Sequence, residues 1–125
     1  MKVLANDGIS QNSKKELIDL NFKIFDTKID QSELIRYINK NHIEIILVRS
    51  ATTINSEILN NCKSIKLIGR AGVGLDNIDL ISAKKNNVRV FNTPNASSIS
   101  VAELVISHLL SANSCLLYTS DAADE

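Results

Sequence analysis

The sequence predicts an α/β domain built on a five-stranded parallel sheet. Short runs rich in Ile and Val alternate with helical patterns along the 125 residues, as expected of repeated strand–helix–strand units. Most of these runs are apolar almost continuously, which is typical of strands covered by helices on both faces. A chain of this length has room for one domain and can bury roughly two-thirds of its unfolded-chain surface.

The five expected strands are residues 2–5, 22–25, 43–48, 65–68 and 88–91. No internal repeat or low-complexity segment interrupts them, and the single proline, Pro94, follows the last. In an open parallel sheet the carboxyl ends of the strands meet at one edge, where ligands bind. Candidate functional residues are therefore those that directly follow the strands.

Helix starts are predicted from short polar residues ahead of apolar patterns. Three pairs have capping-box spacing, namely Ser13 with Glu16, Asp30 with Glu33, and Ser100 with Glu103. After the last pair, apolar residues recur on one face with a period of about 3.6 residues, which predicts a strong helix that includes His108. Two further helices are expected after Asn55 and Asn77.

Composition excludes several classes of partner. Fourteen basic and fourteen acidic residues give zero formal charge, which argues against nucleic acid or an anionic membrane surface. Charged or polar residues interrupt the apolar runs, which are too short to cross a bilayer, and the N-terminus lacks the apolar core of a signal peptide. We therefore expect a cytoplasmic protein. Cys62 and Cys115 are too few for a disulfide framework or a metal site, and Cys62 is interpreted as a small packed residue.

Two arginines stand near the expected binding edge. Arg49 and Ser50 follow the third strand, and Arg70 follows the fourth. A guanidinium fork binds carboxylate or phosphate through paired hydrogen bonds. The position of Arg49 directly after an apolar strand favours ligand binding over a surface ion pair, whereas for Arg70 the two interpretations are equally open.

Gly72, Val73 and Gly74 form a glycine-rich segment in which backbone amides can approach a ligand. It is not a dinucleotide fingerprint, because Asn77 stands where the third glycine belongs. Turn formation and anion cradling remain equally open. The segment after the first strand, residues 6–8, suits a tight turn with an Asx contact, and this interpretation is preferred there.

The histidines do not supply a catalytic base in this interpretation. His42 precedes the third strand, at the wrong edge of the sheet, and His108 lies on the apolar face of the last helix, where packing is the commoner situation. No acid, base and nucleophile can be assembled from the remaining residues.

Three strand-end segments together resemble the D-isomer-specific 2-hydroxyacid dehydrogenases, and within them the branch that acts on 3-phosphoglycerate. The segments are LVRSATTI (47–54), GRAGVGLDNIDL (69–80) and FNTPNASSISVAEL (91–104). Their order and spacing match as well, so that the resemblance extends from Met1 to about Ala112. It implies a flavodoxin-like three-layer substrate domain, residues 1–112, which lacks the Rossmann NAD-binding domain.

The resemblance also implies functions for individual residues. Arg49 and Ser50 would contact the phosphate or carboxylate end of the substrate, and the backbone of residues 72–74 would face the substrate carboxylate and the nicotinamide. Val73 would touch the cofactor from across the cleft. Ser97 and Ser98 are candidates for a substrate contact, although relatives often carry Asn at the position of Ser97.

The implied activity is NAD-dependent oxidation of a phosphorylated 2-hydroxy acid, here 3-phosphoglycerate to 3-phosphohydroxypyruvate in serine biosynthesis. The family's catalytic histidine–carboxylate pair, its substrate arginine and its GxGxxG loop belong to a downstream domain. We therefore expect this chain alone to be inactive, to bind no NAD tightly, and to expose an apolar patch that a later segment covers in relatives. The parent enzyme is expected to be a homo-oligomer.

Two other protein classes share this architecture. Hydroxypyruvate and glyoxylate reductases share the architecture, and a receiver-like binding module shares the strand order but requires an aspartate where Arg49 stands. The tail CLLYTSDAADE (115–125) departs from the family and is similar to the translation of a sequencing adapter. We expect residues 113–125 to be non-native or disordered and without function.

Overall fold

Five parallel strands form one sheet in the order β2-β1-β3-β4-β5 in the computed structural model, which describes residues 1–93 and 100–113. The strands are β1 (Lys2–Ala5), β2 (Lys23–Phe25), β3 (Ile45–Val48), β4 (Leu67–Ala71) and β5 (Arg89–Thr93). Every neighbouring pair is parallel, which confirms the predicted fold class. The order is flavodoxin-like, with its reversal between β1 and β3.

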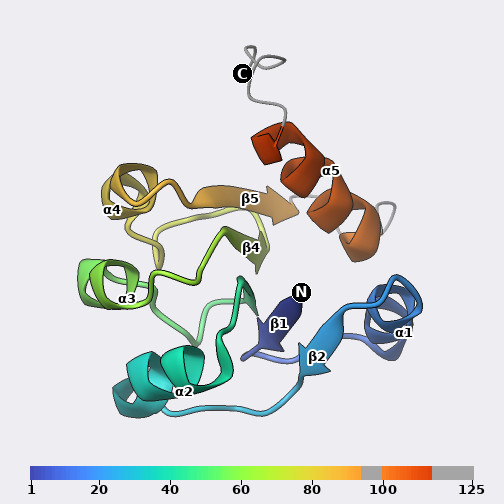
Figure 1. The fold of residues 1–125 in the computed structure, drawn as a ribbon, viewed down its shortest axis with the longest axis horizontal. Helices are drawn as coiled ribbons and strands as arrows, with labels where there is room; N and C mark the ends of the chain where they lie inside the picture. Colours follow the sequence, from blue (N-terminus) through green and yellow to red (C-terminus); the bar gives the residue numbers. More distant parts are fainter. Residues whose placement is uncertain (94–99, 114–125) are drawn as a thin grey trace.

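Helices cover both faces of this sheet. They are α1 (Gln11–Asp19), the 3₁₀ turn η1 (Gln31–Glu33), α2 (Leu34–Asn41), α3 (Ser56–Asn61), α4 (Leu80–Lys85) and α5 (Val101–Asn113). Figure 1 shows α1 and α5 on one side of the sheet and α2, α3 and α4 on the other. Among the described residues, no helix combines the length and apolar character that a membrane crossing requires.

The sheet divides the apolar core into two clusters. Leu4, Ile46 and Ile68 point toward α2, α3 and α4, whereas their strand neighbours Ile45 and Leu67 point toward α1 and α5. This alternation follows from the two-residue period of a strand. Because both faces are apolar and buried, the strands read as continuous hydrophobic runs, which is why they could be located in the sequence.

Strand bounds differ from the expectation in a consistent direction. Ile43, Ile65 and Val88 were expected to begin strands, but they precede them and pack in the cluster under α2, α3 and α4. At the other end, β4 and β5 run beyond their apolar residues because the ladder continues through the pair Ala71 and Thr93. Apolar character therefore marks burial, while strand ends depend on pairing between distant segments.

Two of the predicted helix caps are confirmed. The Asn55 side chain accepts a hydrogen bond from Ile58 N at 3.0 Å and begins α3. Ser100 Oγ accepts from Glu103 N at 3.2 Å at the start of α5. In both cases a polar side chain satisfies an amide that has no partner within the helix.

Three other cap predictions are wrong. Ser10, not Ser13, caps α1, and Asp79, not Asn77, caps α4. Asp30 precedes η1 but its side chain makes no capping hydrogen bond. Ser and Asp recur closely along the chain, so the spacing rule alone does not select the residue whose backbone is extended.

Candidate functional site

A cleft of about 230 Å³ opens at the carboxyl ends of β3, β4 and β5, on the side of the sheet covered by α1 and α5. Its lining includes residues between β1 and α1, residues within β3, β4 and β5, and Arg49 directly after β3. Lining residues include Gly8, Arg49, Gly69, Arg70, Phe91 and Thr93. The cleft therefore lies where an open parallel sheet binds its ligands.

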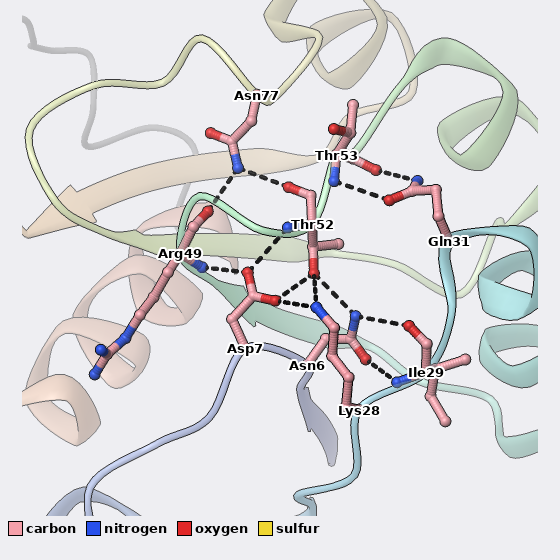
Figure 2. A network of polar contacts seen from close by, with 9 residues as sticks. All are labelled: Asn6, Asp7, Lys28, Ile29, Gln31, Arg49, Thr52, Thr53 and Asn77. Atoms are coloured by element: carbon pink, nitrogen blue, oxygen red, sulfur yellow. Dashed lines mark hydrogen bonds and ion pairs between the residues drawn. The ribbon is translucent and has the colours of Figure 1, made fainter.

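Arg49 lines this cleft directly after β3, and Ser50 is the next residue along the chain. Both are exposed, and the Arg49 guanidinium forms no ion pair with any described residue. Figure 2 shows its side chain extending away from the polar contacts made by its own backbone. Arg49 is thus a cation available to an external anion. Arg49 stands where a receiver module would need an aspartate.

Arg70 was expected to follow the fourth strand, but it belongs to β4, where it pairs with Asn92 in the β4–β5 ladder. Its Nη1 donates to the carbonyl oxygen of Gly74 at 2.6 Å, and its Nε is buried without a partner among the described residues. The guanidinium therefore closes the turn formed by residues 72–74.

The turn at residues 72–74 is built to present amides. Gly72 has φ of 133°, a conformation that favours glycine. Arg70 binds the Gly74 carbonyl, and Asn92 Nδ2 donates to the Val73 carbonyl at 2.7 Å. The amides of Val73 and Gly74 donate to no other described residue. Side chains thus hold the carbonyls, while two neighbouring amides remain available to an acceptor.

Gly69 also lies within β4, although the expected fourth strand ended at residue 68. A Cβ at this position would lie 2.5 Å from Cζ of Phe91 and 2.9 Å from Cδ2 of Leu47. The Phe91 ring therefore packs directly over the bare backbone of β4. This glycine serves close packing beneath the cleft rather than backbone freedom.

Asp7 is the residue that sequence reasoning missed. Its carboxylate accepts hydrogen bonds from the backbone amides of Arg49 (2.8 Å) and Thr52 (3.1 Å), from the Thr52 hydroxyl (2.6 Å) and from Lys28 Nζ (2.6 Å). Its side chain is only 3% exposed. The preferred interpretation of residues 6–8 as a simple tight turn is therefore incomplete.

Electrostatics keep this carboxylate charged. Burial by itself would raise the pKa of Asp7, but the hydrogen bonds from Lys28, Thr52 and the Arg49 amide outweigh it and hold the pKa below its ordinary value. Asn6 extends the same contacts, donating to Thr52 Oγ1 at 2.9 Å and accepting from Ile29 N at 2.8 Å. The loops after β1, β2 and β3 are thereby joined (Figure 2).

Asn77 joins the loop after β4 to the same unit. Its Nδ2 donates to the carbonyl oxygens of Arg49 at 2.6 Å and Thr52 at 2.7 Å. Asn77 thus bridges two loops instead of capping a helix. Arg49 and the turn at 72–74 consequently lie at one margin of the sheet, as the sequence interpretation required.

Neither histidine reaches the cleft as a free base. His42 is exposed after α2 with φ of 54°, and β3 begins three residues later. His108 stacks on Phe91 with ring centroids 4.8 Å apart and accepts from Arg89 Nε through Nδ1 at 3.2 Å. Burial lowers the pKa of His108, and the charge of Arg89 lowers it further. Ser97 and Ser98, expected to contact substrate, lie outside the described residues.

Comparison with known proteins places the chain in a family. Residues 3–125 match the model of the D-isomer specific 2-hydroxyacid dehydrogenase, catalytic domain. A hydroxypyruvate reductase of Thermotoga maritima is 36% identical over 87% of this chain and 35% of its own length. A D-3-phosphoglycerate dehydrogenase of Archaeoglobus fulgidus is 39% identical over 90% of this chain and 21% of its own length.

Solved structures agree with this assignment. An NAD⁺-bound 3-phosphoglycerate dehydrogenase of Entamoeba histolytica superposes with a TM-score of 0.62 at 27% identity, covering 89% of this chain and 38% of that one. The TT0316 protein of Thermus thermophilus gives a TM-score of 0.69 at 20% identity over 97% of this chain and 43% of that one, which shows the shared fold. The chain spans between about a fifth and a third of the curated relatives described above.

Proposed function

This chain belongs to the D-isomer specific 2-hydroxyacid dehydrogenases, and we propose that it supplies the anion-binding half of the substrate site of a D-3-phosphoglycerate dehydrogenase. The parent enzyme would oxidise 3-phosphoglycerate to 3-phosphohydroxypyruvate in serine biosynthesis, with NAD accepting the hydride. The catalytic histidine, its carboxylate partner and the clamping arginine would come from outside this chain, so that residues 1–112 alone would bind substrate without oxidising it.

One observation carries this proposal. Among the described residues, the Arg49 guanidinium has no ion pair and the amides of Val73 and Gly74 have no hydrogen-bond acceptor. They follow the neighbouring parallel strands β3 and β4 and so lie at one edge of the sheet, where Arg49 and Ala71, the residue before the turn, line the cleft. A substrate with two anionic groups, a phosphate at one end and a carboxylate at the other, needs two separate groups of donors. Arginine suits the phosphate through paired bonds, and neighbouring amides suit the carboxylate. Ser50 and Arg70 would add donors beside these groups.

The described residues fit NAD only as a contact from one side. Val73 is 73% exposed at the tip of the turn and offers an apolar side chain to a nicotinamide ring. A pyrophosphate cradle is not offered there, because Asn77 replaces the third glycine of the dinucleotide motif and its amide group is bound to the loop after β3. We therefore expect no tight NAD binding by this chain.

A second candidate is a hydroxypyruvate or glyoxylate reductase. The similarity to a curated hydroxypyruvate reductase favours it as much as the similarity to the phosphoglycerate enzymes favours the first. The two functions differ in one chemical group, since 3-phosphoglycerate and D-glycerate differ only by the phosphate. Affinity for this pair of ligands therefore separates them.

The test is titration calorimetry of the 125-residue chain with each ligand. We expect 3-phosphoglycerate to bind more tightly than D-glycerate, and Arg49→Ala to weaken it by about tenfold or more, as loss of a charge-assisted hydrogen bond predicts. Arg36→Ala, which removes an arginine whose side chain is 83% exposed on α2, is the matched control and should bind normally. Equal affinity for the two ligands would favour the reductase, and tight NAD binding would refute the assignment of the site.

A further inference from the structure

The loop between β3 and α3, which carries Arg49 and Ser50, is held by polar side chains on both sides. Asp7 accepts the amides of Arg49 and Thr52, at 2.8 and 3.1 Å. Asn77 donates to the carbonyls of the same two residues, at 2.6 and 2.7 Å. One side chain therefore takes two donors of the loop, and the other takes two of its acceptors (Figure 2).

The carboxylate of Asp7 is fully engaged by these contacts. A carboxylate offers about four lone-pair positions, and Asp7 accepts from two amides, one hydroxyl and one ammonium group. Lys28 supplies the balancing positive charge, while its own side chain remains 54% exposed. Asp7 consequently binds the backbone of Arg49 without capturing its guanidinium.

We propose that Asp7 is a positioning residue of the anion site: its buried carboxylate, paired with Lys28, fixes the backbone at residues 49–52 so that Arg49 extends into the cleft. Asn77 completes this positioning from the side of the loop after β4. The proposal rests on the function proposed above, because it assumes that Arg49 binds the substrate anion. Asp7 and Asn77 would thus influence the affinity for the substrate without touching it.

The position of Asp7 in the fold supports this assignment. β1 and β3 are neighbours at the point where the strand order reverses, and Asp7 bridges from the end of one to the loop after the other. Its partners lie 21, 42 and 45 positions away along the chain. Asn would retain the shape of the side chain, but its amide group would meet donors where the carboxylate accepts.

The first measurement is hydrogen exchange by nuclear magnetic resonance in the unliganded 125-residue chain. The amides of Arg49 and Thr52 should be protected although they belong to no helix or strand, and Asp7→Asn should make them exchange at least about tenfold faster. Asp19→Asn, at the exposed end of α1, removes the same charge and should change neither amide. Unprotected amides in the unsubstituted chain would overturn the proposal.

The second measurement is 3-phosphoglycerate binding by titration calorimetry. We expect Asp7→Asn to weaken binding by about tenfold, and to have no further effect in an Arg49→Ala background, because Asp7 acts through Arg49. If Asp7→Asn disturbed only the structure in general, it would weaken binding equally in both backgrounds, and this result would refute the positioning assignment. Asn77→Ala should act in the same direction and serves as the test if Asp7→Asn does not fold.

The two measurements separate the two proposals. If the unsubstituted chain binds no 3-phosphoglycerate while its Arg49 and Thr52 amides are protected through Asp7, the proposed function fails and the fixing of the loop stands. If it binds through Arg49 and the Asp7→Asn variant binds equally well, the function stands and the positioning assignment fails.

Discussion

Replacing Gly69 by alanine should destabilise the protein through a clash beneath the cleft. The new Cβ would lie 2.5 Å from Cζ of Phe91 and 2.9 Å from Cδ2 of Leu47. Carbon atoms normally approach no closer than about 3.5 Å, so that the ring must move by about 1 Å. It is held in place by its stack on His108 and is 6% exposed.

The magnitude follows from two opposing terms. Overpacking of a core costs about 1–3 kcal/mol, whereas replacing glycine inside a strand gains about 0.5–1 kcal/mol. We expect a net loss of about 1–2 kcal/mol in the free energy of unfolding, measured by urea denaturation, and a melting temperature lower by roughly 5 °C per kcal/mol.

The double variant Gly69→Ala/Phe91→Leu tests the cause. If the ring is the obstacle, alanine should cost less in the leucine background, with a coupling of about 0.5 kcal/mol or more. Equal costs in both backgrounds, or a Gly69→Ala protein as stable as the parent, would refute the packing argument.

Three further predictions concern titratable groups. Because the pKa of His108 is lowered in the folded state, stability should fall as pH drops through about 6.5, and His108→Gln should flatten urea-unfolding free energies between about pH 7.5 and 5. The pKa of Asp7 is likewise depressed, so its contribution to the free energy of unfolding should be present above about pH 3.9 and be lost on further acidification. In acid unfolding, Asp7→Asn should lack this pH-dependent loss of stability. Burial raises the pKa of Cys62 to about 11, so in a Cys115→Ser background Cys62 should resist iodoacetamide at pH 8 and react in urea, and rapid native alkylation would contradict this.

The elements of the sheet could be predicted because their signal is local. Runs such as Ile45–Val48 are buried on both faces and therefore apolar throughout. The polar ends of β4 and β5 could not be predicted in the same way. Arg70 is in the sheet because it pairs with Val48 on one side and Asn92 on the other, and Asn92 because it pairs with Arg70. Nothing in any one of these segments alone indicates that pairing.

Only the part of the candidate site that has a local signal in the sequence could be predicted. Arg49 and the glycines at 72 and 74 are visible as residues that follow apolar strands, and the structure places them after the parallel neighbours β3 and β4, at one edge of the sheet. The contribution of Asp7 depends on partners up to 45 positions away, which local turn preferences cannot reveal. Its position directly after the first strand, beside the reversal of strand order, was the available signal.

Anchoring of the loop at residues 49–52 by Asp7 and Asn77 has a thermodynamic consequence. The conformational entropy of this loop is lost when the chain folds, so ligand binding does not have to order the loop again. The backbone at Arg49 should therefore change little when a ligand binds, and the conformational change at this end of the site should be confined to the Arg49 side chain.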